Sequence, residues 1–123
     1  MKSLIATLVV ALACVASLAA VADLTGVWQL HLDPDFGGED DTVVCTFSQE
    51  DRKLTIRCGS GLPLVGEVNG DKVRFEAKTG PQNEFTAVFN GVLDEEVRTM
   101  KGTWHLETGR EVRDGKFDAR RQP

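Results

Sequence analysis

Residues 44–58 read Val44-Cys45-Thr46-Phe47-Ser48-Gln49-Glu50-Asp51-Arg52-Lys53-Leu54-Thr55-Ile56-Arg57-Cys58. Apolar and polar residues alternate with the period of a β-strand on both sides of a charged turn. A hairpin with Asp51-Arg52 at its tip places Cys45 opposite Cys58. Counted outward from that tip, the two cysteines form a non-hydrogen-bonded pair, where Cα atoms approach to about 4.5 Å, near the short end of disulfide geometry. The stretch therefore predicts a hairpin closed by a Cys45–Cys58 disulfide.

The same alternation continues through the rest of the chain, with turn residues at short intervals. Asn69-Gly70 predicts the tip of another hairpin, because both central residues of a type I′ turn need positive φ. In residues 85–106 the favoured register faces Leu93 with Met100, and a competing register turns at Asn90-Gly91. The expected strands lie within residues 24–32, 44–49, 54–58, 64–68, 71–78, 85–93, 100–106 and 115–120.

These strands share one apolar face, and the sequence has no long apolar pattern of helical period. Without a helix to cover a sheet, the apolar face buries itself by closing on itself. The prediction is an all-β fold, an antiparallel up-and-down barrel of about eight strands. A sandwich of two sheets is the alternative.

The N-terminus has the layout of a cleavable secretory signal: Lys2, an apolar run over residues 4–16, and Ala20-Val21-Ala22 before Asp23. Residues 1–22 are therefore expected to be removed, leaving residues 23–123 as a single domain in the periplasm or outside the cell. Two alternatives are a transmembrane anchor, which residues 4–22 could form by length, and lipidation at Cys14. After signal removal we expect no membrane span.

The composition limits the kinds of partner that the protein is expected to bind and the cellular compartment in which it is expected to fold. Removing residues 1–22 takes away Lys2 and no acidic residue, so the net charge moves from −5 to −6. A negative surface disfavours nucleic acid and anionic lipid as partners. Cys14 leaves with the signal, so Cys45 and Cys58 remain as an even pair, as an oxidising compartment favours.

The first expected strand opens with Gly26-Val27-Trp28, and Gly102-Thr103-Trp104 repeats the pattern near the end of the chain. On this G-x-W motif the chain resembles the calycin group of barrels, which includes lipocalin-like and avidin-like proteins, and it is similar in outline to secreted bacterial protease-inhibitor barrels. The resemblance implies that a basic residue near the last strand, Arg120 or Arg121, packs over Trp28. The mature chain has no tyrosine, unlike avidin-like biotin pockets.

An inner face rich in aromatic residues suggests ligand binding. An eight-stranded barrel is just wide enough to be filled by side chains or to hold one small ligand. We expect Trp28 to be structural at a closed end, and Phe75, Phe89 and Trp104 to line an open mouth. The leading hypothesis is an exported, non-enzymatic binding module that holds a small apolar ligand at one open end, without a cofactor. A filled barrel is the alternative. The aromatic stripe comprises Trp28, Phe47, Phe75, Phe85, Phe89, Trp104 and Phe117.

A second hypothesis is a protein-interaction barrel that inhibits a secreted or foreign hydrolase through an exposed loop. The acidic loop at residues 33–41 carries an apolar anchor, Phe36, beside Asp35 and Glu39. An EF-hand would need a bidentate glutamate at its twelfth position, which is Val44 here, so we expect no metal site in this loop, and a weak divalent-cation site is the alternative.

The remaining polar residues do not predict catalysis. His31 and His105 alternate out of phase with the tryptophans, so they should point outward and be solvated. A metal site shared by the two histidines would lack a third and fourth ligand. No G-x-S-x-G elbow is present, and both remaining cysteines are expected to be bonded, so we expect no enzyme.

Overall fold

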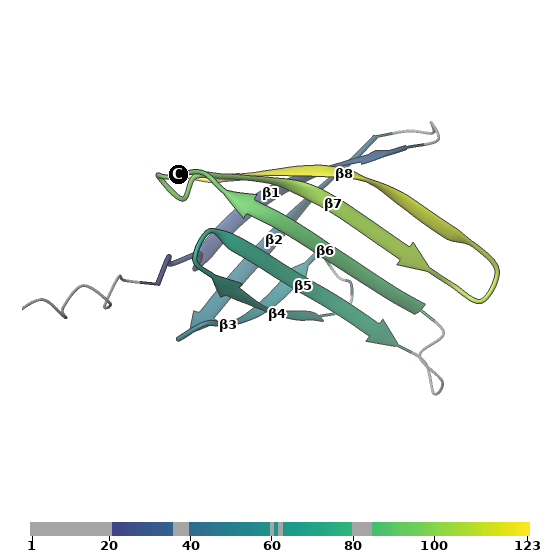
Figure 1. The fold of residues 1–123 in the computed structure, drawn as a ribbon, viewed down its shortest axis with the longest axis horizontal. Coiled ribbons are helices and arrows are strands. Elements are labelled where there is room, and N and C mark those ends of the chain that lie inside the picture. Colours follow the sequence, from purple (N-terminus) through teal and green to yellow (C-terminus); the bar gives the residue numbers. More distant parts are fainter. Residues whose placement is uncertain (1–20, 36–39, 60, 62, 80–84) are drawn as a thin grey trace, which may run out of the picture.

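The computed structural model describes residues 21–35, 40–59, 61, 63–79 and 85–123. In this part of the chain eight antiparallel strands pair in sequence order, and β8 returns to β1 to close a barrel (Figure 1). The prediction of an all-β up-and-down barrel is confirmed, and the sandwich alternative is wrong. The strands are β1 (Gly26–Pro34), β2 (Asp41–Glu50), β3 (Lys53–Cys58), β4 (Pro63–Asn69), β5 (Lys72–Thr79), β6 (Phe85–Leu93), β7 (Thr99–Glu107) and β8 (Val112–Arg121).

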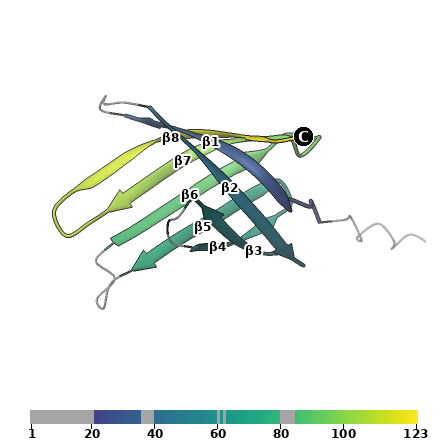
Figure 2. The same ribbon diagram turned by 180° about the vertical axis from the view of Figure 1, so that it is seen from behind.

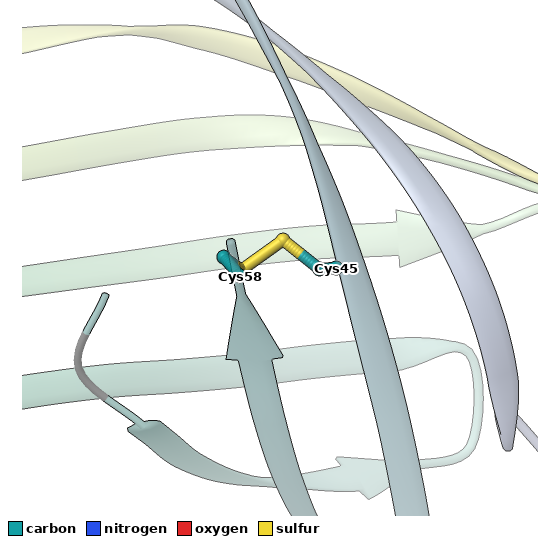
Figure 3. Close-up of a disulfide and its surroundings, with 2 residues drawn as sticks. All are labelled: Cys45 and Cys58. Atoms are coloured by element: carbon teal, nitrogen blue, oxygen red, sulfur yellow. A yellow bond between two sulfur atoms is a disulfide. The ribbon is translucent and has the colours of Figure 1, made fainter. Parts of the chain in front are cut away.

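The hairpin of β2 and β3 has the predicted register. Cys45 pairs with Cys58, their Cα atoms are 4.0 Å apart, and a disulfide joins them (Figure 3). Glu50 pairs with Lys53, which leaves Asp51 and Arg52 at the tip as expected. Turn position, apolar alternation and cysteine spacing all specify the same register, and for that reason the sequence predicts it correctly.

The hairpin of β4 and β5 turns one residue later than predicted. Asn69 pairs with Lys72, so the tip is Gly70-Asp71 and not Asn69-Gly70. Gly70 has a φ of 65°, and a turn with positive φ at its first central position takes glycine there. The observed register also pairs Val68 with Val73, which places two buried β-branched side chains side by side. A slip of two residues keeps every side chain on its predicted face.

The last two hairpins settle the remaining alternatives. Leu93 pairs with Met100, so the favoured register of β6 and β7 is confirmed and a turn at Asn90-Gly91 is wrong. β8 begins at Val112, three residues before the expected strand, and pairs with β1 on its other side (Figure 2). β1 itself starts at Gly26, and Leu24, expected in the strand, precedes it yet is fully buried.

The barrel interior is the single core of the described residues. Its buried members come from all eight strands, and no polar or charged residue of the described part is buried. Among these residues no helix is long and apolar enough to cross a membrane. The β2–β3, β4–β5 and β6–β7 turns lie at one end of the barrel together with residues 21–25 and the C-terminus (Figures 1 and 2). The other ends of the strands lie opposite.

Candidate ligand-binding site

One end of the barrel is closed by Trp28 and the segment that precedes β1. Trp28 is fully buried, and its Nε1 donates a hydrogen bond to the carbonyl oxygen of Leu24 at 2.9 Å. Gln49 holds the same segment, because its Oε1 accepts from the Leu24 N–H at 2.8 Å and its Nε2 donates to the Ala22 carbonyl at 2.7 Å. Residues 22–25 therefore form the floor of the barrel.

Arg121 covers this floor. Its guanidinium lies 5.3 Å from the centre of the Trp28 ring, a cation–π distance. It donates to the carbonyl oxygens of Asp23, Thr25 and Val97 at 2.8, 2.7 and 3.1 Å. The resemblance implied a basic residue over Trp28, and the structure shows that it is Arg121. Arg120, one residue earlier, alternates to the outer face and is exposed.

Aromatic rings connect the closed end to the opposite end. Trp28 packs on Phe47 with ring centres 5.6 Å apart, and Phe47 meets Phe75 edge to face at 5.7 Å. Phe75 stacks on Phe89 at 4.8 Å, and Phe117 contacts both of these rings edge to face. Such offset and edge contacts favour an ordered arrangement of rings. This column of rings gives the open half of the barrel a rigid base.

Above this column the interior is open. A cavity of about 460 Å³ extends to the end of the barrel opposite Trp28. It lies inside the barrel next to Ala77 of β5 and Ala87 of β6, which pair with each other. These two side chains are small, so they leave the interior beside them unfilled. The lining comprises Leu30, Leu32, Pro34, Asp41, Val43, Cys58, Gly61, Leu64, Phe75, Ala77, Phe85, Ala87, Phe89, Trp104, His105, Leu106 and Arg113.

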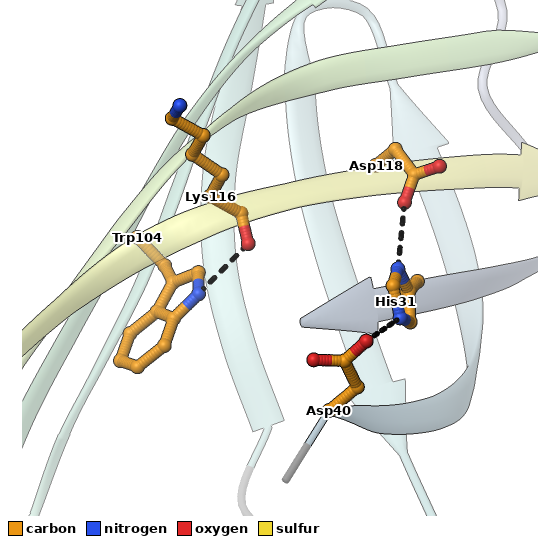
Figure 4. A network of polar contacts seen from close by, with 5 residues as sticks. All are labelled: His31, Asp40, Trp104, Lys116 and Asp118. Atoms are coloured by element: carbon orange, nitrogen blue, oxygen red, sulfur yellow. Dashed lines mark hydrogen bonds and ion pairs between the residues drawn. The ribbon is translucent and has the colours of Figure 1, made fainter. Parts of the chain in front are cut away.

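The three residues predicted to line a mouth, Phe75, Phe89 and Trp104, all border this cavity. Phe75 is buried beneath it, whereas Phe89 is partly exposed. Trp104 Nε1 donates to the carbonyl oxygen of Lys116 at 3.0 Å, so the indole is held against β8 (Figure 4). Its partner in register is Gly115, where an added Cβ would come within 2.5 Å of the indole ring. Glycine at this position lets the tryptophan approach the backbone.

Sequence reasoning missed the charged residues of the cavity. Asp41 and Arg113 share the inner face of their strands with Val43 and Gly115, and both line the cavity. Arg113 precedes the strand expected over residues 115–120, so the sequence alone did not assign its side chain to either face of the sheet. Asp41 was counted as part of an acidic loop, although it begins β2 and pairs with Leu32. Extending the alternation three residues outward from each expected strand would have found both.

The two histidines are partly exposed, as their phase predicted, but each bridges two carboxylates, and His105 also borders the cavity. His31 Nε2 lies 3.1 Å from Asp40 and its Nδ1 3.2 Å from Asp118 (Figure 4). His105 contacts Asp114 through Nδ1 and Glu107 through Nε2.

These carboxylates favour the protonated, positively charged form of each imidazole ring. Asp40, followed by Asp118, raises the pKa of His31. Asp114, followed by Glu107, raises the pKa of His105. Each ring directs its two nitrogens toward different strands or loops, which is not a chelating arrangement. Over the described ranges, no group of three or more His, Cys, Asp or Glu side chains could hold a metal ion.

The comparisons with known proteins support the fold. No family model matches the chain, and no curated protein matches it. Among solved structures, EF1p2_mFAP2b bound to DFHBI is similar to this chain, with a TM-score of 0.57 and 14% sequence identity. The match covers 80% of this chain and 94% of that one. This chain therefore has the fold of a barrel that has been solved with a ligand bound.

The alternative interaction loop is described only in part. Asp35 is exposed in the turn after β1, and its N–H donates to the Asp114 carbonyl at 3.0 Å. Phe36 and Glu39, the other two residues named for this loop, lie outside the described residues. The interaction of this loop with a partner protein stays a prediction, as does the signal at residues 1–22, of which only Val21 and Ala22 are described.

Proposed function

We propose that the protein is an exported, non-enzymatic binding module that holds a small apolar ligand in the open half of its barrel. The observation that carries this proposal is the cavity itself. Its volume of about 460 Å³ falls within the range of roughly 300–1,000 Å³ typical of small-molecule sites. Its walls are mainly aliphatic and aromatic, with few polar groups, as such sites require.

Two further observations support the proposal. A barrel of the same fold has been solved with DFHBI bound, so this architecture can hold a ligand. The secretory signal predicted at residues 1–22 supports export to the periplasm or the exterior. Both remaining cysteines form a disulfide, which such a compartment favours.

A filling variant tests whether the cavity is the binding site. Ala87 lines the cavity, and its replacement Ala87→Trp would occupy the space opposite Ala77. Asn90→Trp adds the same ring at an exposed, outward position of the same strand and serves as the matched control. Binding of Nile red, a neutral apolar dye, is measured by fluorescence titration for each full-length variant.

We expect the wild type and Asn90→Trp to bind the dye with equal affinity and Ala87→Trp to bind it at least about tenfold more weakly, a difference of about 1.4 kcal/mol. Thermal unfolding of each variant confirms that the barrel has formed. Equal binding by Ala87→Trp and the wild type would place the dye elsewhere and reject the cavity as the site. No binding by the folded wild type would reject the proposed function.

A further inference from the structure

Strand β8 carries two arginines on the inner face of the barrel, at opposite ends. Arg121 lies at the closed end and Arg113 at the open end, eight residues earlier on the same strand and in the same phase. Together with Asp41 they are the charged residues that alternation places on the inner face of the described strands. A charge on the inner face of an otherwise apolar barrel needs a partner or water.

Arg121 has its partners within the protein. Three carbonyl oxygens and the Trp28 ring surround its guanidinium. Arg113, by contrast, makes no side-chain hydrogen bond or ion pair with any residue that the structure describes. It lines the cavity at the mouth and is exposed there.

Two carboxylates next to Arg113 in the β7–β8 hairpin are directed elsewhere. Asp114 and Glu107 lie on the outer face and bind His105. Asp41 is on the inner face, but it pairs with Leu32, whose partner on β8 is Phe117, four residues from Arg113. Strand spacing and rise per residue therefore separate Asp41 from Arg113 by roughly 15 Å along the sheet. The guanidinium remains available to a group that enters the mouth.

We infer that the ligand is amphipathic, a single carboxylate on an apolar chain, with its carboxylate on Arg113 and its chain in the cavity against the adjacent rings of Phe89 and Trp104. This inference rests on the proposed function and deepens it. Guanidinium groups bind planar carboxylates through two parallel hydrogen bonds. One arginine in a protein of net charge −5 suits a monoanion and disfavours polyanions such as phosphates. Fatty acids of moderate length belong to this chemical class.

A matched pair of ligands tests the carboxylate. Decanoate and decanol have the same chain and differ in the charge of the head group. Each is used to displace Nile red from the full-length protein at constant ionic strength. We expect decanoate to bind about three- to tenfold more tightly than decanol, since a charge-assisted contact at an exposed mouth is weaker than a buried one.

Substitutions then assign the preference to one residue. Arg113→Gln should remove the preference for decanoate and leave decanol binding unchanged, and Arg113→Lys should retain part of it as a point charge. Arg110→Gln is the matched control, because Arg110 is an exposed arginine in the β7–β8 turn that does not line the cavity. It should leave both affinities as they are in the wild type.

The outcomes separate this inference from the proposed function. If Nile red binds but decanoate and decanol compete equally, or neither competes, the inference is wrong while the apolar site stands. If Arg110→Gln lowers decanoate binding as much as Arg113→Gln, the preference comes from the general field of the protein and the contact with Arg113 is rejected. If the folded protein binds no dye at all, the proposed function fails and the inference fails with it.

Discussion

The two ends of this barrel are built from the same eight strands yet differ in what fills them. At the closed end large side chains and residues 22–25 occupy the interior, and Trp28 and Leu24 are fully buried. At the open end small side chains such as Ala77 and Ala87 leave a cavity of about 460 Å³. An eight-stranded barrel has just enough width for either solution. In this chain side-chain size along each strand, and not strand number, decides where the space lies.

The polar groups of the closed end and of the open end also differ, in whether they have partners within the protein. Trp28 and Arg121 direct their donors to backbone carbonyls of the floor and, in one case, of Val97, so the closed end satisfies itself. At the open end Trp104 is satisfied by Lys116, but Arg113 extends to the mouth without a hydrogen-bond or ion-pair partner among the described residues. Stability should therefore depend on the closed end and ligand binding on the open end.

The largest expected difference between the ends comes from their tryptophans. Trp28→Ala should destabilise the protein by about 3–5 kcal/mol, because it creates a cavity in a packed core. Trp104→Ala should cost about 2 kcal/mol, since its ring already borders empty space and the loss of its packing is smaller. Urea unfolding of both variants gives the two free energies of unfolding.

Dye binding provides the converse measurement. Trp104→Ala should weaken Nile red binding, whereas Trp28→Phe, a milder variant that keeps the closed end largely filled, should leave it unchanged. Equal losses of stability at the two positions, or weaker dye binding in Trp28→Phe, would contradict a division of labour between the two ends.

Substitution of the two arginines of β8 should also cost more stability at the closed end than at the open end, but the difference should be smaller than that between the tryptophans. Arg121→Met removes three hydrogen bonds and the contact with the Trp28 ring, and we expect it to lower the free energy of unfolding by about 1–2 kcal/mol. Arg113→Met, at the same phase of the same strand, should change it by less than about 0.5 kcal/mol. Urea unfolding measures both. A loss at Arg113 as large as that at Arg121 would show that Arg113 has a structural role.

The closed end could be predicted from the sequence only in part. The G-x-W motif and strand alternation identified Trp28 as a core residue, and the resemblance left Arg120 and Arg121 as alternatives for its cover. The phase of β8 decides between them, since only Arg121 points inward. The floor itself was not predicted. Leu24 fits the alternation of the first strand, and its position below the barrel depends on the side chain of Gln49, which is 25 residues away.

The open end shows a different limit of prediction. Phe75, Phe89 and Trp104 could be named because they belong to one apolar face. The volume beside them depends on which side chains meet inside the barrel, and the two small residues Ala77 and Ala87 become neighbours only through the register of β5 and β6. Local hairpins with short turns, such as that of Cys45 and Cys58, fix their own register. Packing across the interior involves strands that are distant in sequence, so the chain alone does not state it.

The smallest expected effect concerns pH and the outer surface near the open end. His31 and His105 connect β8 to its neighbours, through Asp118 on one side and Asp114 on the other. Because these carboxylates raise the pKa of each histidine above 6.5, the folded protein binds the proton more tightly than the unfolded chain does. The resulting stabilisation is complete below pH 6.5 and is lost as the pH rises through the raised pKa values.

NMR titration should give both histidines a pKa above 6.5, and Asp114→Asn should lower the value for His105 while leaving that of His31 unchanged. Amide exchange should accelerate with pH at Asp114 and Asp118, beyond the intrinsic pH dependence, and not at Arg121, since no histidine lies at the closed end of the described barrel. An equal excess at Arg121 would mean that the two ends open together and would contradict their independence.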